Sequence, residues 1–232
     1  MAKTFTKIGK EIPIAVKQGG PDVVGNSRLR ALMAEARSEN MPKDNVEKAI
    51  KRALEKNQGD FKEVVFEGYG PHGIAYLVET ATDNNTRTVA NVRSYFTKCG
   101  GSLGTSGSVS FMFDHKCVFR IKYQEGMDID ELQLALCECD DDPEVFIEEQ
   151  EDKDENITKN VVIYGAYESY GAIQKYIEDN GYELVSGGFE RIPNVELKDV
   201  TPEQRETLDK LTGLLEDDDD VTNVYSTLKP AE

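Results

Sequence analysis

Residues 74–98, IAYLVETATDNNTRTVANVRSYFTK, join a strand pattern directly to a helix pattern. The first part of this stretch, 74–82, is rich in β-branched and aromatic residues, which predicts a strand. Its second part, 85–98, repeats apolar residues at the helical period and places Val92 and Phe96 on one face, which predicts a helix. A strand followed at once by a helix indicates a domain that mixes α and β elements.

Further elements on the C-terminal side continue the same unit. We expect them at these ranges: strands 109–114 and 116–122, helix 202–216 and strand 221–227. The helix has a clear start, because Thr201-Pro202-Glu203-Gln204 combines a capping box with proline at the first helical position. The resulting order, βαββαβ, is typical of a ferredoxin-like unit. One more strand is expected before this unit, at 62–67.

A second small α+β segment interrupts that unit. Its expected elements are helix 128–138, strands 144–149 and 160–165, helix 167–179 and strand 182–191. We therefore predict a discontinuous ferredoxin-like domain formed by 61–125 and 193–232. An acidic α+β domain, 126–192, is inserted into it.

The first sixty residues predict a basic helical domain, 1–60. Apolar residues recur at helical spacing over 4–18, 27–39 and 43–57, and short connections between such helices favour a small bundle. Pro13 lies inside the first helix and is expected to kink it or to remove one backbone hydrogen bond. The predicted fold class is thus α+β, with a three-helix N-terminal domain and two ferredoxin-like domains, one inserted in the other.

Charge is distributed very unevenly along the chain. The 232 residues carry a formal net charge of −17. Residues 1–121 hold 18 Lys and Arg against 13 Asp and Glu, a net charge of +5, whereas residues 122–232 hold 9 against 31, a net charge of −22. Such asymmetry suggests a division of labour between domains. A basic face can meet phosphates while the rest stays acidic, because screening limits exposed charges to about 8–10 Å.

Several classes of protein are excluded by composition. No apolar run is long enough to span a membrane, and the N-terminus has no uninterrupted apolar segment of the kind found in signal peptides. The four cysteines are too few for a disulfide framework in a chain of this length. We therefore expect a cytoplasmic protein with no membrane partner.

Two glycine-rich segments resemble phosphate-binding motifs in part. Gly68–Gly73 satisfies G-x-G-x-x-G, but a strand is expected after it, so no helix N-terminus is available for a pyrophosphate. We interpret it as a turn between strands. Gly100–Ser108 lacks the Lys-Ser/Thr pair of a P-loop. It is either a mobile loop that contacts RNA or protein, or a flexible connection between strands.

Catalytic and metal-binding motifs are not recognisable. The two histidines, His72 and His115, stand in no known catalytic pattern. The Cys137-x-Cys139 spacing is too short for a zinc half-site. The acidic runs 140–142 and 217–220 lack calcium-loop spacing, and we interpret them as solvated surface. No catalytic residue, cofactor or metal is expected.

Basic residues form the most coherent candidate site, and several share helical faces. The candidate nucleic-acid-binding residues are Lys3, Lys7, Lys10, Lys17, Arg28, Arg30, Arg37, Lys43, Lys48, Lys51, Arg52, Arg87, Asn91 and Lys98. Such side chains pair with phosphates and sugars rather than read bases. The alternative interpretation is an ordinary solvated helix surface.

Long blocks of the sequence identify a family. The segments FTKIGKEIPIAVKQGGPD (5–22), NMPKDNVEKAIKRA (40–53) and EGYGPHG (67–73) strongly resemble the YebC/PmpR family, and the resemblance covers nearly the whole chain. It implies three domains, one inserted in another, and no enzymatic activity. It also implies a basic helical nucleic-acid face that contains Lys3, Lys7, Lys10, Arg28, Arg30 and Lys43. Family members usually carry a further basic segment with a tryptophan before the FTK block, which is expected to strengthen binding in those relatives.

Family members act as DNA-binding transcriptional regulators or as ribosome-associated translation factors that relieve stalling, so the resemblance implies a gene-expression factor bound to DNA or ribosomal RNA. The sequence does not decide between these targets, and a monomer is favoured. A second hypothesis is a protein-interaction adaptor whose acidic domain docks a basic partner such as a ribosomal protein. A third, a hydrolase using His72 or His115, has the least support.

Overall fold

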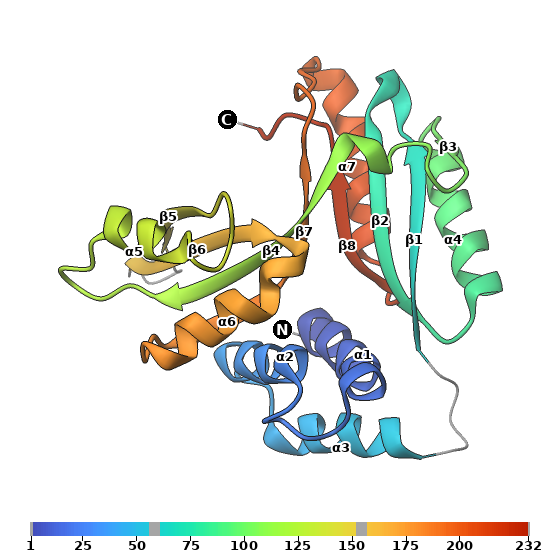
Figure 1. The fold of residues 1–232 in the computed structure, drawn as a ribbon. Coiled ribbons are helices and arrows are strands. Elements are labelled where there is room, and N and C mark those ends of the chain that lie inside the picture. The colour runs from blue at the N-terminus through green and yellow to red at the C-terminus, as the bar shows by residue number, and fades with distance from the viewer. Residues whose placement is uncertain (1, 56–60, 152–156, 232) are drawn as a thin grey trace. The chain divides into compact units, whose positions relative to one another are not determined.

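A computed structural model describes residues 2–55, 61–151 and 157–231 (Figure 1). The fold is mixed α+β, with three N-terminal helices followed by two four-stranded sheets. The chain divides into two compact units. The first comprises Met1–Ile14, Lys48–Asp114 and Arg191–Glu232, and the second comprises Ala15–Glu47 and His115–Glu190. The finer division into three domains stays a prediction.

The three predicted N-terminal helices are present as α1 (Ala2–Gly19), α2 (Ser27–Ser38) and α3 (Lys43–Leu54). Positions 56–57 of the predicted third helix lie outside the described residues. Helix α1 continues through Pro13, so the proline does not end it. The apolar face predicted for α1 is buried, with Ile8 and Ile12 fully inaccessible. Asn26 caps α2, because its Oδ1 accepts a hydrogen bond from the Leu29 N–H at 3.0 Å.

The first sheet lies in the first unit and has the strand order β3–β1–β2–β8. Its strands are β1 (Lys62–Tyr69), β2 (Ala75–Thr82), β3 (Ser102–Leu103) and β8 (Val221–Ser226). Helices α4 (Asn85–Lys98) and α7 (Pro202–Glu216) pack on one face of it. Their core includes Tyr76 and Phe96, whose rings meet edge to face at 5.8 Å, and Leu208 and Leu211 of α7. The capping box predicted at Thr201 is present.

The prediction that strands 109–122 belong to this first sheet is wrong. Strand β1 pairs antiparallel with β2 instead, in a register that joins Tyr69 to Ala75. The turn between them includes the 3-10 segment η1 (Pro71–Gly73), in which His72 has φ 63° and Gly73 has φ 72°. Positive φ at glycine is inexpensive and allows the tight reversal. The interpretation of Gly68–Gly73 as a turn between strands is confirmed for Gly70–Gly73, whereas Gly68 and Tyr69 are the last residues of β1.

The second sheet has the order β5–β6–β4–β7 and contains β4, the strand that the sequence pattern predicts for the first sheet. Its strands are β4 (Phe113–Lys122), β5 (Glu144–Glu151), β6 (Ile157–Ala166) and β7 (Leu184–Pro193). With helices α5 (Ile129–Leu136) and α6 (Tyr170–Asp179), the chain order is βαββαβ, and the strand order is that of a ferredoxin-like sheet. Two further 3-10 turns, η2 (Ser110–Met112) and η3 (Tyr167–Ser169), precede β4 and α6.

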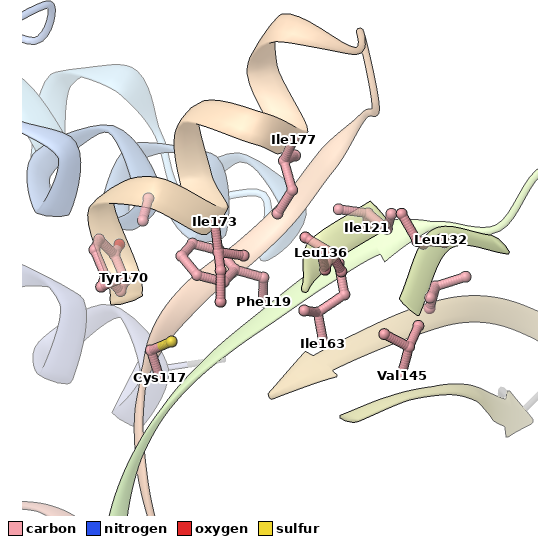
Figure 2. Close-up of a cluster of buried hydrophobic side chains, with 12 residues drawn as sticks. Cys117, Phe119, Ile121, Leu132, Leu136, Val145, Ile163, Tyr170, Ile173 and Ile177 are labelled. Atoms are coloured by element: carbon pink, nitrogen blue, oxygen red, sulfur yellow. The ribbon is translucent and has the colours of Figure 1, made fainter. Parts of the chain in front are cut away.

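The core of this second sheet lies between one of its faces and the two helices. Figure 2 shows Phe119 and Ile121 of β4 directed toward Ile173 of α6 and Leu136 of α5. Alternate residues of β4 point into this core, as a strand with one covered face requires. The βαββαβ pattern therefore occurs in the second sheet, with β4 as its first strand, and residues 109–112 lead into that strand.

Candidate nucleic-acid interface

Three lysines of α1, called here the lysine row, are Lys3, Lys7 and Lys10. Their spacing of four and three residues places them on one face of the helix. All three reach residues at the C-terminal end of the first unit. Lys3 forms an ion pair with Asp217. Lys7 Nζ donates to Asn223 Oδ1 at 2.6 Å, and Lys10 Nζ donates to Asp219 O and Asp220 Oδ1, both at 2.7 Å.

The partners belong to a short segment between α7 and β8 that we call the acidic turn, residues 217–220. Asp220, the last residue of the turn, has only 6% of its side chain exposed. Its Oδ2 accepts hydrogen bonds from Arg87 Nη2 at 2.8 Å and from Thr88 Oγ1 at 2.9 Å. Burial raises the pKa of Asp220, but the hydrogen bonds from Lys10, Arg87 and Thr88 outweigh it and lower the pKa to about 2.

Asp218 is also held by α4. Its Oδ2 accepts from Asn91 Nδ2 at 3.1 Å and from Tyr95 Oη at 2.9 Å. Burial and the nearby Asp218 carboxylate raise the pKa of Tyr95 to about 12. The interpretation of 217–220 as plain solvated surface is therefore wrong for two of its four residues. A turn with four consecutive carboxylates is tolerated here because cations and polar groups from two helices surround it.

The predicted basic face of α4 is split by this arrangement. Arg87 is half exposed and bridges Asp83 at 3.1 Å and Asp220 at 2.8 Å. Asn91 joins it at the acidic turn. Lys98 lies elsewhere, exposed, with its ammonium 5.8 Å from the centre of the Tyr95 ring. The structure thus brings together five of the predicted residues: Lys3, Lys7, Lys10, Arg87 and Asn91.

A second polar chain continues from the lysine row across the first sheet. Asn223, which accepts from Lys7, donates through its Nδ2 to Glu79 Oε2 at 3.2 Å. Glu79 Oε1 in turn accepts from Arg191 Nε at 3.0 Å. Glu79 and Arg191 are each about one-fifth exposed. None of these three partners was a sequence candidate, because they are polar residues inside otherwise apolar strand patterns.

The other predicted residues lie on all three N-terminal helices. Arg28 donates to Gln18 at 3.0 Å, and Arg30 pairs with Glu178 at 2.7 Å and with the carbonyls of Val23 and Val24. Lys43 pairs with Glu47 at 3.5 Å. Arg52 lies over the Phe61 ring at 5.7 Å. Exposed positions are occupied by Lys17, Arg37, Lys43, Lys48, Lys51 and Arg52.

The glycine- and serine-rich loop after α4 is held by a carboxylate. Glu67 of β1, itself buried, accepts hydrogen bonds from three backbone N–H groups: Gly107 and Val109 at 2.7 Å and Ser110 at 2.8 Å. Burial raises the pKa of Glu67, but these backbone donors outweigh it and lower the pKa. Glu67 therefore anchors the end of this loop, from Gly107 to Ser110, and whether the loop contacts RNA or protein stays a prediction.

Candidates for catalysis and metal binding remain scattered. His72 is exposed in its turn, and His115 stacks on Tyr167 with ring centres 4.3 Å apart. Within the described residues, no group of three or more His, Cys, Asp or Glu side chains is arranged to hold a metal ion. Cys99 and Cys117 are buried free thiols, and burial raises the pKa of Cys117 to about 12. The helices that the structure describes are too short or too polar to cross a membrane.

Comparisons with known proteins agree along the whole chain. Residues 1–56 match the family described as TACO1/YebC protein N-terminal domain, and residues 61–228 match TACO1/YebC second and third domain. A relative from Parabacteroides distasonis is 58% identical over 229 residues, 99% of this chain and 90% of the relative. A relative from Bacteroides thetaiotaomicron is 56% identical over 232 residues, 100% of this chain and 91% of the relative. Each is named "Probable transcriptional regulatory protein".

A solved structure supports the same assignment. The crystal structure of a conserved hypothetical protein from Aquifex aeolicus superposes with a TM-score of 0.80 at 32% sequence identity. The match covers 100% of this chain and 91% of that protein. Together with the family matches over 1–56 and 61–228, this shows that the chain belongs to the TACO1/YebC family.

Proposed function

We propose that this protein is a non-enzymatic, cytoplasmic regulator of gene expression that acts by binding nucleic acid. The names of its bacterial relatives support a regulatory role. The observation that carries the binding proposal is the lysine row, because its three ammonium groups lie on one helix face and already bind oxygen ligands at short range. Phosphate oxygens are ligands of the same kind.

The proposed contacts are made with the nucleic-acid backbone. Lysine offers a point charge and three donors, which suits phosphate, and it carries no geometry that selects a base. The exposed cations Lys48, Lys51 and Arg52 of α3 belong to the same unit as the lysine row, and we propose them as further phosphate contacts. Binding of this type weakens steeply as salt rises, because each neutralised phosphate releases counterions. Promoter DNA and the RNA of the ribosome are the two targets that the experiment must separate.

The test compares binding to a mixed-sequence DNA duplex with co-sedimentation on purified bacterial ribosomes, each over a salt series. The variant Lys3→Glu/Lys7→Glu is expected to bind at least about tenfold more weakly, with a shallower salt dependence. The control Lys175→Glu/Lys210→Glu changes the same charge at exposed positions of α6 and α7. Equal losses in variant and control would contradict the proposed face.

The ribosome arm also tests the adaptor hypothesis. Ribosome binding that survives the reversal of Lys3 and Lys7, but fails when the exposed Asp141 and Asp142 are changed to Asn, would assign recognition to the acidic domain. Retention on ribosomes alone supports a translation factor. Retention on the duplex alone supports a transcriptional regulator.

A further inference from the structure

We propose that the acidic turn, residues 217–220, regulates the nucleic-acid site by occupying Lys3, the exposed end of the lysine row, so that a phosphate binds there by displacing Asp217. The inference rests on the proposed function and adds its regulation. Carboxylate and phosphate oxygens compete for the same ammonium groups. Each lysine of the row contacts a residue of the segment 217–223. Two of the three contact a carboxylate, and the third contacts the amide oxygen of Asn223.

Burial divides the acidic turn into a fixed part and a displaceable part. The Lys10–Asp220 pair is nearly inaccessible, with side chains 12% and 6% exposed. The Lys3–Asp217 pair is open to water, with side chains 65% and 69% exposed. An ion pair so exposed contributes little to stability and is screened by salt. Phosphate can therefore take Lys3 from Asp217 while Asp220 keeps the turn anchored.

The contacts of the two middle residues support this division. Asp218 is held by Asn91, by Tyr95 and by the backbone N–H of Asp220 at 2.9 Å, so it belongs to the anchor. Asp219 is exposed and engages Lys10 through its backbone carbonyl, which leaves its carboxylate at the surface beside the lysine row. Asp217 and Asp219 are thus the two exposed carboxylates that an approaching phosphate must overcome.

The variant Asp217→Asn/Asp219→Asn separates this regulation from simple folding effects, because it leaves Asp218 and Asp220 in place. Its matched control is Glu206→Gln/Asp209→Asn, which removes the same charge from exposed positions of α7 in the same unit. We expect the variant to bind the DNA duplex or the ribosome at least about threefold more tightly than the control. The slope of log binding constant against log salt concentration is expected to steepen by about 1, because the variant frees one lysine, Lys3.

A second measurement follows the turn directly in the unaltered chain. A carbodiimide joins neighbouring carboxylates and amines, so it is expected to link Lys3 to Asp217 in the free protein. Saturating duplex or ribosome should suppress this link, as read by mass spectrometry of the peptides. The exposed pair of Lys229 and Asp199, 3.8 Å apart, is the internal control and should stay linked.

The outcomes distinguish the two proposals. A variant that binds no more tightly than its control, or a Lys3–Asp217 link that persists in the nucleic-acid complex, overturns the regulation while the proposed function stands. Failure of the unaltered chain and of the variant to bind either probe overturns the proposed function, and the regulation with it. Tighter binding by the variant together with loss of the link supports both.

Discussion

Lys10 Nζ lies 2.7 Å from Asp220 Oδ1, and the two charged side chains are almost excluded from water. This pair joins the first helix of the chain to a turn that lies 210 positions later. A buried ion pair is costly to break on one side only, because the remaining charge is left without its partner in a medium that solvates it poorly.

Replacement of Lys10 by Met is therefore expected to lower the free energy of unfolding by about 2–3 kcal/mol, since Asp220 keeps Arg87 and Thr88 but loses one cation. The measurement is denaturant unfolding of each variant. Lys3→Met removes the exposed ion pair of the same helix and serves as control, with almost no expected change. Similar losses in the two variants would contradict the division into fixed and displaceable parts.

Asp220 also gives the fold an acid-sensitive element. Its pKa is about 2 in the folded chain against an ordinary 3.8, so the unfolded chain takes up the proton first as pH falls. The stabilisation is complete above about pH 4 and is lost as pH falls toward 2, with a total of about 2 kcal/mol. Asp220→Asn should flatten the decline of stability over this range. An unchanged decline would show that other carboxylates, such as Glu67, produce it.

The carboxylate of Glu67 is expected to hold the end of the loop that follows α4, because it accepts three backbone hydrogen bonds there. Glu67→Gln keeps the size of the side chain but removes the negative charge to which three N–H groups donate. The free energy of unfolding is therefore expected to fall by about 2–3 kcal/mol. Hydrogen exchange at Gly107, Val109 and Ser110 should accelerate. The exposed Glu63 of the same strand is the control position. Unaltered exchange at the three amides would contradict the anchoring role.

Two glycines should respond to alanine in opposite directions. At Gly9 of α1, an added Cβ meets nothing within 4 Å, so Gly9→Ala is expected to stabilise by about 0.5–1 kcal/mol through its helix propensity. At Gly68 an added Cβ would lie 2.7 Å from Ser102 O and 2.9 Å from Phe96 Cε1. Gly68→Ala should therefore destabilise by about 1–3 kcal/mol. Thermal unfolding of both variants checks the signs, and a shared sign contradicts the packing described.

Most helices and strands were predictable because they depend on local periodicity. Helix α4 begins and ends where the pattern in 85–98 places it, and the cap at Thr201 follows from four consecutive residues. Strand pairing was less predictable. The apolar residues of β4 alternate in the same way whichever sheet they join, so their pattern does not say which sheet that is. In the structure the turn at Gly70–Gly73 pairs β1 with β2 in the first sheet, and β4 belongs to the second.

The candidate site was predictable only in part, for a related reason. Helical spacing placed Lys3, Lys7 and Lys10 on one face, but it carries no information about which distant residues face them. Asp220 contacts Arg87 across 133 positions. In the sequence it is one of four consecutive aspartates that no local pattern distinguishes. In the structure the side chain of Asp220 is buried and that of Asp217 is exposed. Whether any of the candidate cations contacts nucleic acid stays a prediction.

The chain enters the second sheet and leaves it at two points that lie next to each other in space. The carbonyl of Met112, just before β4, accepts from the N–H of Asn194, just after β7, at 2.9 Å. Residues 113–193 therefore leave the first unit after Met112 and return to it at Asn194, and these two residues are hydrogen-bonded neighbours. In evolutionary terms, a gene segment coding for such a unit can be gained, exchanged or lost at one site. The surrounding fold then needs only a short turn to close the gap, and its threading does not change.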